Sequence, residues 1–238
     1  MKALYSLCLL LLVPQAAHAN DIAALEAAIS DAEARLEGHE STRFSFRKTI
    51  EQPDVRVVLR YDPSQKPPWS VIGEGTDAAE AASRSHNESL AGAEEPPDRD
   101  ALITDPRRLL TAGETDFLRE EDGAWVYNFD LKEGVEMAGG GERADITRYL
   151  NGEVFVDKES GRLSGMRFFA PEPFKPAPVA KVKEMNVHID FAPVDGGEGP
   201  LVSVREETKV SGSAMFQSFS EQSTTTYSGF EMVETAPE

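Results

Sequence analysis

Apolar and polar residues alternate along most of the chain, and a period of two predicts β-strands. The clearest segment is AWVYNFDL, residues 124–131, where every second residue from Trp125 to Leu131 is large and apolar. The same alternation recurs in residues 42–50, 55–61, 67–74 and 184–191, and the C-terminal segments 201–210 and 214–230 are also predicted to be strands. Strands and helices do not alternate regularly, so the pattern predicts a mainly β protein with one antiparallel sheet.

One predicted hairpin carries apolar residues on both of its faces. In NGEVFVDKESGRLSGMRFFAP, residues 151–171, Val154 and Val156 point to one side and Phe155 to the other. Turn formers follow at 157–161, and the chain returns through a second apolar run that includes Phe168. We interpret this as a sheet covered on both sides, with Phe155 and Phe168 in one layer and the two valines in the other.

The N-terminal part of the mature chain predicts one amphipathic helix. Asn20 and Asp21 are good helix caps, and Gly38 is a typical stop signal, so we expect the helix to run over 20–37. Its apolar residues recur at steps of three and four and form one stripe that needs a partner surface. The stripe consists of Ile22, Leu25, Ile29, Ala32 and Leu36.

Several segments interrupt the strand pattern. Residues 73–100 are acidic and poor in large apolar side chains, which predicts a flexible insertion that is either a flap with a weak helix near residue 80 or simply disordered. A short helix is expected around Pro106, and residues 134–143 are expected to form a loop. The four prolines within 171–178 predict an extended connector or an edge strand.

The apolar strand faces exceed what the predicted helices can cover. A soluble monomer exposes at most a few hundred Å² of contiguous apolar surface, so the sheet needs to cover part of itself. Curling achieves this and predicts a strongly curved antiparallel sheet, an unclosed half-barrel, with an N-terminal helix and lid helices. The curled sheet either encloses an apolar cavity or has a completely filled core. No linker divides the chain, so residues 20–238 are expected to form a single domain.

The first residues have the features of a secretory signal. Lys2 precedes an apolar run from Leu4 to Val13, and Ala17-His18-Ala19 fits the signal peptidase rule, which predicts a signal peptide at 1–19. A membrane anchor is the alternative, but a span needs roughly 20 apolar residues. Cleavage would leave 238 − 19 = 219 residues without a cysteine, because Cys8 is the only one. We therefore expect a soluble periplasmic protein without disulfides.

Charge narrows the set of partners. The chain has 24 basic and 42 acidic side chains, so removal of Lys2 with the signal leaves 23 − 42 = −19. A charge of this sign repels nucleic acid and anionic lipid head groups. We interpret the acidity as favouring solubility; selection of a cationic partner or calcium is the alternative, although no calcium-loop motif is present.

The sequence contains no recognisable catalytic or metal-binding motif. The mature histidines, His39, His86 and His188, lie too far apart in sequence to form a typical zinc pair. His188 and Asp190 share one strand face and are the best candidates for proton transfer, which makes a hydrolase the third alternative. We expect a non-enzymatic protein with no catalytic residues, no metal and no cofactor.

The order of these segments resembles the periplasmic outer-membrane lipoprotein carriers (LolA/LolB-like proteins). The resemblance rests on the helix, the Phe-rich first strand, RYDPSQKPPWSVI at 60–72, the hairpin at 149–176 and the long C-terminal strands, and it covers about 22–232. It implies an unclosed β-barrel with a helical lid that holds acyl chains in a cavity. The acidic insertion at 73–100 departs from the compact carriers.

These observations predict a soluble exported protein that binds a lipid or a lipid-modified chain in an apolar cavity between sheet and helices. The alternative is an envelope interaction module with a filled core that binds a protein partner, through edge strands or the acidic insertion. Neither nucleic acid nor an integral membrane span is expected. The predicted cavity residues are Phe44, Phe46, Val57, Leu59, Trp69, Val71, Trp125, Tyr127, Phe129, Val187, Ile189 and Phe191.

Overall fold

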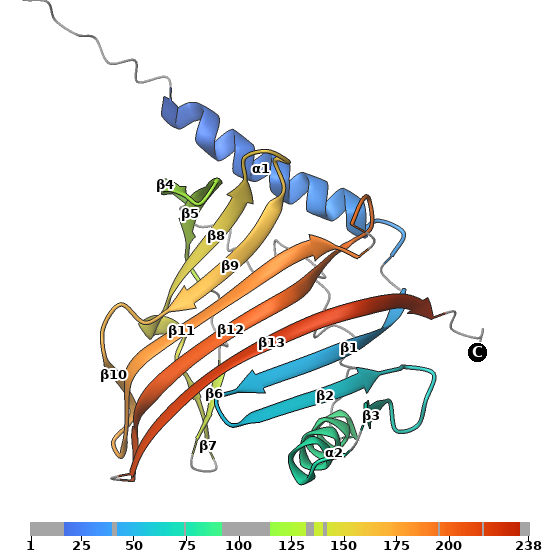
Figure 1. Ribbon diagram of the computed structural model, residues 1–238. Helices are drawn as coiled ribbons and strands as arrows, with labels where there is room; N and C mark the ends of the chain where they lie inside the picture. The colour runs from blue at the N-terminus through green and yellow to red at the C-terminus, as the bar shows by residue number, and fades with distance from the viewer. Residues whose placement is uncertain are drawn as a thin grey trace, which may run out of the picture.

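A computed structural model describes residues 17–39, 42–73, 75–91, 115–131, 136–139, 142–194, 196–215 and 217–233. These residues form two α-helices, one short 3-10 helix at Thr147–Tyr149, and mostly β-strands (Figure 1). No helix in this part of the chain is long and apolar enough to cross a membrane. The predicted signal peptide and the short helix expected near Pro106 lie wholly or mainly outside the described residues, so both stay predictions.

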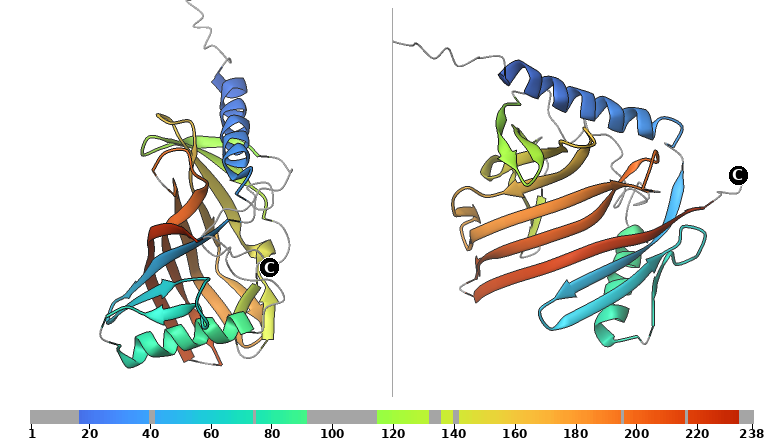
Figure 2. Two further views of the ribbon diagram at one scale, coloured as in Figure 1. Left: turned by 90° about the vertical axis from the view of Figure 1, so that its right-hand side faces the viewer. Right: turned by 45° about the horizontal axis from the view of Figure 1, so that its top comes forward.

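One antiparallel sheet contains eleven of the strands, in the order β3-β2-β1-β13-β12-β11-β9-β8-β5-β4, with β10 added beside β11. Their bounds are β1 Arg43–Gln52, β2 Val55–Tyr61, β3 Trp69–Val71, β4 Phe117–Glu121, β5 Ala124–Phe129, β8 Asn151–Asp157, β9 Leu163–Phe169, β10 Phe174–Ala177, β11 Ala180–Pro193, β12 Leu201–Ala214 and β13 Gln217–Val233. Among these strands β3 and β4 end the order without pairing to each other, so the sheet is curved but not closed (Figure 2). This confirms the predicted fold class.

The hairpin of β8 and β9 has two apolar faces, as predicted. Val154 and Val156 are fully buried in one cluster, whereas Phe155 packs with Ala124 and Val126 on the opposite face. The predicted place of Phe168 was wrong, because it lies in the layer of the two valines. Directly opposite residues share a face, and β9 pairs Met166 with Val154 and Phe168 with Gly152.

Helix α1, Ala17–Leu36, packs its apolar stripe against the end of the sheet formed by β4, β8, β9 and β12. Its predicted C-terminal end is confirmed within one residue, and Gly38 has a positive φ of 81°, which glycine adopts without steric cost. Leu25, Ile29 and Ala32 are buried, but Ile22 is 44% exposed, so its predicted place in the buried stripe was wrong.

Helix α2, Asp77–Ala91, lies within the predicted insertion and packs on β2 and β3. The alternative of plain disorder was wrong for this part, and residues 92–100 lie outside the described residues. Among the side chains of this helix that the structure describes, the small Ala79 lies against a cluster that includes Trp69. The Oγ of Ser83 and the Nδ2 of Asn87 donate to the carbonyl oxygen of Trp69, at 3.1 and 3.0 Å.

The predicted loop at 134–143 and the proline-rich segment at 171–178 can both be compared with the structure. The predicted loop at 134–143 was wrong in part, because β6, Glu136–Gly139, and β7, Glu142–Asp145, form a separate two-stranded sheet. Its glycines and small residues resemble a loop in sequence, but backbone pairing needs no large side chains. The proline-rich segment at 171–178 contains β10, which pairs only with β11 among the described strands and so confirms the prediction of an edge strand.

Candidate functional site

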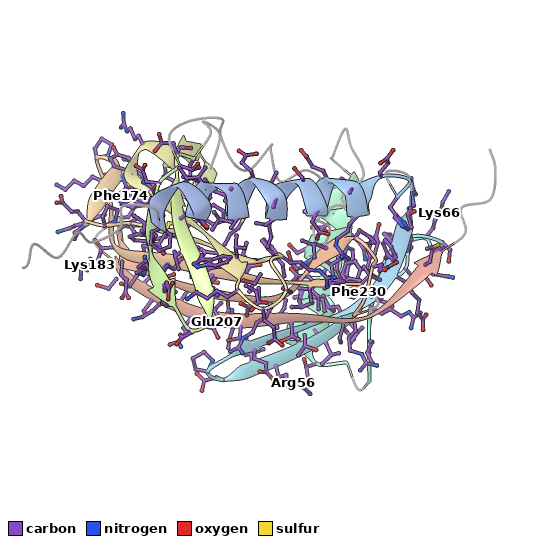
Figure 3. All side chains as sticks on the ribbon, turned by 90° about the horizontal axis from the view of Figure 1, so that it is seen from above. Arg56, Lys66, Phe174, Lys183, Glu207 and Phe230 are labelled. Carbon is purple, nitrogen blue, oxygen red and sulfur yellow. The ribbon has the colours of Figure 1, made fainter. Side chains whose placement is uncertain are left out.

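Both helices lie on the same face of the sheet. One continuous row of directly paired residues crosses the sheet, and such residues share a face. The row runs Tyr127–Val154–Met166–Ile189–Glu206–Thr225–Ile50–Val57. One end, at Tyr127 and Val154, is buried in an apolar cluster together with residues of α1, which we call the α1 cluster. The other end, at Val57, is buried in a second cluster together with residues of α2, which we call the α2 cluster. We call this the helix face; Figure 3 shows α1 above it.

The predicted cavity residues therefore belong to two clusters rather than one. The α1 cluster contains Tyr127 and Phe129, with Trp125 and Phe191 packed against it as half-buried residues. The α2 cluster contains the five predicted residues Phe46, Val57, Leu59, Trp69 and Val71. Phe44 is buried but belongs to neither cluster, and Val187 and Ile189 lie half-buried on β11 between them. The structure thus brings most of the predicted set to one face but divides it between two helices.

The middle of the helix face has an apolar side and a polar side. On β11, Met185, Val187, Ile189 and Phe191 form a row of half-buried apolar residues. The neighbouring positions on β12 and β13 are polar, and Thr208 Oγ1 donates to Glu206 Oε1 at 3.1 Å. We call the row of four the β11 row and the positions Glu206, Thr208, Ser223 and Thr225 the polar strip.

Sequence reasoning missed the polar strip, although a signal for it exists. In LVSVREETKV, residues 201–210, the apolar alternation stops after Val204 and polar residues take both sides of the strand. A strand with two polar faces is unusual beneath helices, because buried polar groups need hydrogen-bond partners. The loss of alternation therefore marks the place where the helix face changes from apolar to polar.

A lysine lies at the edge of the α2 cluster, and its partners fix its position. Lys48 Nζ lies 5.7 Å from the centre of the Trp69 ring and 5.6 Å from that of Tyr227, within the range of cation–π attraction. It also lies 3.1 Å from His86 Nε2, while Nδ1 of the same histidine is 2.8 Å from the carbonyl oxygen of Ala82. This geometry makes Nδ1 the donor to the carbonyl and Nε2 the acceptor of a lysine proton.

A shallow groove lies at the edge of the helix face, where α2 meets β3. It is lined by Pro67, Trp69, Val71, Glu80, Ser83, Arg84, Asn87 and Glu88. Trp69 and Val71 are the only predicted cavity residues in it. The groove is open and mixed in polarity, with two glutamates and one arginine, so its chemistry favours no particular ligand class.

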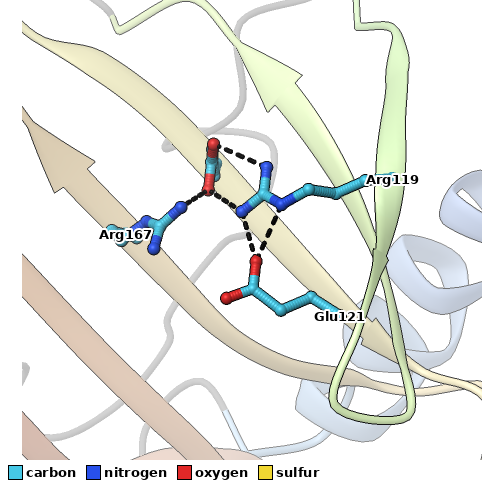
Figure 4. Close-up of polar contacts among 4 residues, drawn as sticks. Arg119, Glu121 and Arg167 are labelled. Carbon is cyan, nitrogen blue, oxygen red and sulfur yellow. Dashed lines mark hydrogen bonds and ion pairs between the residues drawn. The ribbon is translucent and has the colours of Figure 1, made fainter. Parts of the chain in front are cut away.

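The opposite face of the sheet carries a buried ionic cluster (Figure 4). Glu153 on β8 is 5% exposed and accepts hydrogen bonds from Arg119 at 2.9 and 3.0 Å and from Arg167. Glu121 accepts a further bond from Arg119 Nε at 2.8 Å. Burial raises the pKa of Glu153, but the bonds and charges of the two arginines outweigh it and hold the pKa below its ordinary value. The hydrogen bond to Glu153 also raises the pKa of Arg119, so both groups remain ionised.

The candidate proton-transfer pair also lies on this opposite face. His188 Nε2 is 3.0 Å from Asp190 Oδ1, so the structure brings the two predicted residues together. The imidazole ring packs edge-on against Phe155, with ring centres 5.2 Å apart. The pair is therefore separated from the β11 row by the sheet itself. Among the described residues no group of histidine, cysteine and carboxylate side chains has the geometry to hold a metal ion.

Comparison with protein-family models, curated proteins and solved structures finds no match for this chain.

Proposed function

We propose that this protein is an exported, non-enzymatic carrier that binds a lipid, or the acyl chain of a lipid-modified protein, on the helix face. The observation that carries the proposal is the β11 row of four half-buried apolar side chains: Phe191 packs against the α1 cluster, Met185 packs against a further buried cluster at the other end of the strand, and Val187 and Ile189 lie between them. Burying such a side chain completely contributes about 2 kcal/mol, so a row of four favours an apolar ligand along the strand. The resemblance to periplasmic lipoprotein carriers supports the same function and a periplasmic location.

The polar strip indicates the orientation of such a ligand. An acyl chain on the β11 row would lie one strand away from Glu206 and Thr208, which can hydrogen-bond a hydroxyl, amide or amine of a head group. A purely apolar ligand would leave this strip without ligand partners. We therefore propose that the ligand is amphiphilic, with its chain toward α1 and its polar part toward β12 and β13.

Two measurements on the native protein test this function. Solvent extraction followed by mass spectrometry is expected to return a lipid or an acylated peptide. Replacing both Val187 and Ile189 by serine is expected to weaken binding of a fluorescent fatty acid about tenfold, because each serine removes apolar contact area from the row. The matched control replaces Val55 and Met232, which are exposed, by serine and should bind like the wild type.

Two results would contradict the proposal. One is a protein that repeatedly extracts without any lipid and does not bind the fatty acid. The other is equal binding by the row variant and the control variant, with both folded by circular dichroism. An envelope interaction module with a filled core would then be favoured, and pull-downs with and without residues 76–100 would identify its partner surface.

A further inference from the structure

Exposed apolar side chains gather where two neighbouring turns meet. The large apolar residues that the structure shows exposed are Ile22, Val55, Leu118, Val179, Met215, Phe219 and Met232. Three of them belong to the β10–β11 turn or to the β12–β13 hairpin, with exposed fractions of 56% for Val179, 63% for Met215 and 39% for Phe219. We call these three residues the hairpin tip; it lies at the lower left of Figure 1.

Backbone pairing holds the hairpin tip in place. The amide of Met215 donates to the carbonyl oxygen of Val179 at 2.9 Å and so joins the two turns. Strand pairing continues to Ala214 opposite Gln217 at the very end of the hairpin. The ring of Phe219 lies across Gly212, where a Cβ atom would approach it to 2.8 Å. Val179 and Met215 therefore lie in two turns that are joined by a backbone hydrogen bond, and Phe219 lies on the adjoining strand β13.

The local charge around the hairpin tip is opposite to that of the whole chain. Residues 173–183 contain Lys175, Lys181 and Lys183 and no acidic residue, although acidic side chains outnumber basic ones by 42 to 24 overall. All three lysines are exposed, and none pairs with a described carboxylate. Figure 3 shows Lys183 and the neighbouring Phe174 at the end of the sheet opposite Lys66.

We propose that the hairpin tip docks the protein on an anionic lipid membrane. Apolar side chains flanked by lysines suit the membrane interface, because the apolar groups enter the acyl boundary while the lysines meet phosphate groups. The negative charge of the rest of the molecule repels the same surface, but screening limits this repulsion to about 8 Å at physiological salt. In the part of the chain that the structure describes, the hairpin tip with its three lysines is therefore the end that we expect to approach the membrane. A second copy fits this surface less well, since the lysines of two tips would repel each other.

This inference goes beyond the proposed function but connects with it. Strand β11 begins beside the hairpin tip at Ala180 and continues into the β11 row at Met185. A docked tip would thus place one end of the proposed lipid site next to the bilayer. Docking needs no ligand on the helix face, so the Val187 and Ile189 double variant should still bind vesicles if the carrier proposal fails.

Flotation with vesicles tests the docking. The full chain is mixed at low salt with vesicles of phosphatidylglycerol and phosphatidylcholine, or of phosphatidylcholine alone. We expect binding to the anionic vesicles that weakens as salt rises. The double variant Lys181→Gln/Lys183→Gln should partition about 30-fold less, since each lysine near such a surface contributes about fivefold. The double variant Val179→Ser/Met215→Ser should also lose binding, and without any change in net charge.

Matched variants at other places provide the controls. Lys66→Gln/Arg84→Gln makes the same change in charge, and Val55→Ser/Met232→Ser removes similar exposed apolar groups. Both controls should bind anionic vesicles like the wild type. Absence of wild-type binding at low salt, or equal loss in tip and control variants, would overturn the proposal. So would a dimer in sedimentation analysis that only the tip variants abolish, since a second copy would then cover the tip.

Discussion

At the scale of single residues, Glu153 is the most strongly constrained charge in the described part of the protein. Its carboxylate is buried between two arginines that are themselves only partly buried, with side-chain exposures of 35% for Arg119 and 25% for Arg167. Each arginine lies in reach of solvent, but the carboxylate does not. The charge of Glu153 is therefore compensated almost entirely by protein groups. Removing this carboxylate would leave the guanidinium groups of Arg119 and Arg167 facing each other without an anion between them.

Glu153→Gln should lower the free energy of unfolding by about 2 kcal/mol. Removing one partner of a buried ion pair costs roughly 3–5 kcal/mol, and the partial exposure of both arginines reduces this value. Urea denaturation followed by circular dichroism measures the change. Glu207→Gln is the matched control, because Glu207 pairs with Arg205 where both side chains are about half exposed, and it should change stability by less than about 0.5 kcal/mol. Equal losses of unfolding free energy in the two variants would contradict the conclusion that the buried charge of Glu153 stabilises the fold more than an exposed one.

The same residue predicts a pH dependence with a definite sign. The pKa of Glu153 is lower in the folded protein than in the unfolded chain, where it is about 4.3. Its ionised form therefore stabilises the fold fully above that pH, and the contribution is lost as the pH falls through the lower folded-state pKa. The difference in unfolding free energy between wild type and Glu153→Gln should be constant from pH 8 to 6 and shrink below about pH 4. A difference that stayed constant down to pH 3 would show that charge is not the cause.

At the scale of elements, α2 shows how a helix docks largely through small side chains. Ala79 is 3% exposed and contacts the aromatic cluster on β2 and β3, whereas Ala81 on the same helix is exposed.

Ala79→Glu would bury a charge without a partner, so we expect α2 to detach while the sheet stays folded. Hydrogen exchange should then show loss of protection in 77–91 and retained protection in β11 to β13. Ala81→Glu makes the same change on the exposed side of the helix and should leave the protection of residues 77–91 unchanged. Loss of protection in both variants would mean that the lower helix propensity of glutamate, and not the loss of docking, unfolds the helix.

Strands with a strict alternation of apolar and polar residues could be predicted from the sequence. The elements that they pair with or pack against could not. The alternation in residues 55–61 and 184–191 identified β2 and β11, because a half-buried strand needs one apolar side. The layer of Phe168 was mispredicted because it depends on the register across the β8–β9 turn, which alternation within one strand does not determine. The docking of α2 was missed for a similar reason, since its surface partner, Trp69, is contributed by another element.

At the scale of the whole molecule, one sheet joins the two buried clusters that lie beneath the helices, which we call the two cores. The candidate site was predictable as a set of apolar residues on one face, but not as two clusters divided by a polar strip. That division depends on which strands lie in the middle of the sheet, and strand order is not contained in periodicity. Strands β11, β12 and β13 have 14, 14 and 17 residues, and they connect the α1 cluster to the α2 cluster.

This continuity predicts that the two cores unfold together. Trp125 lies beside the α1 cluster and Trp69 within the α2 cluster, so each tryptophan reports on one end of the sheet. In Trp69→Phe the fluorescence of Trp125 should follow the same urea transition as far-ultraviolet circular dichroism, and in Trp125→Phe the fluorescence of Trp69 should do so. The physical reason is that separating the cores would break ladder hydrogen bonds along the full length of at least one long strand. Two resolved midpoints in either variant would instead make the ends independent folding units, and a ligand bound between them would then be expected to merge the two transitions.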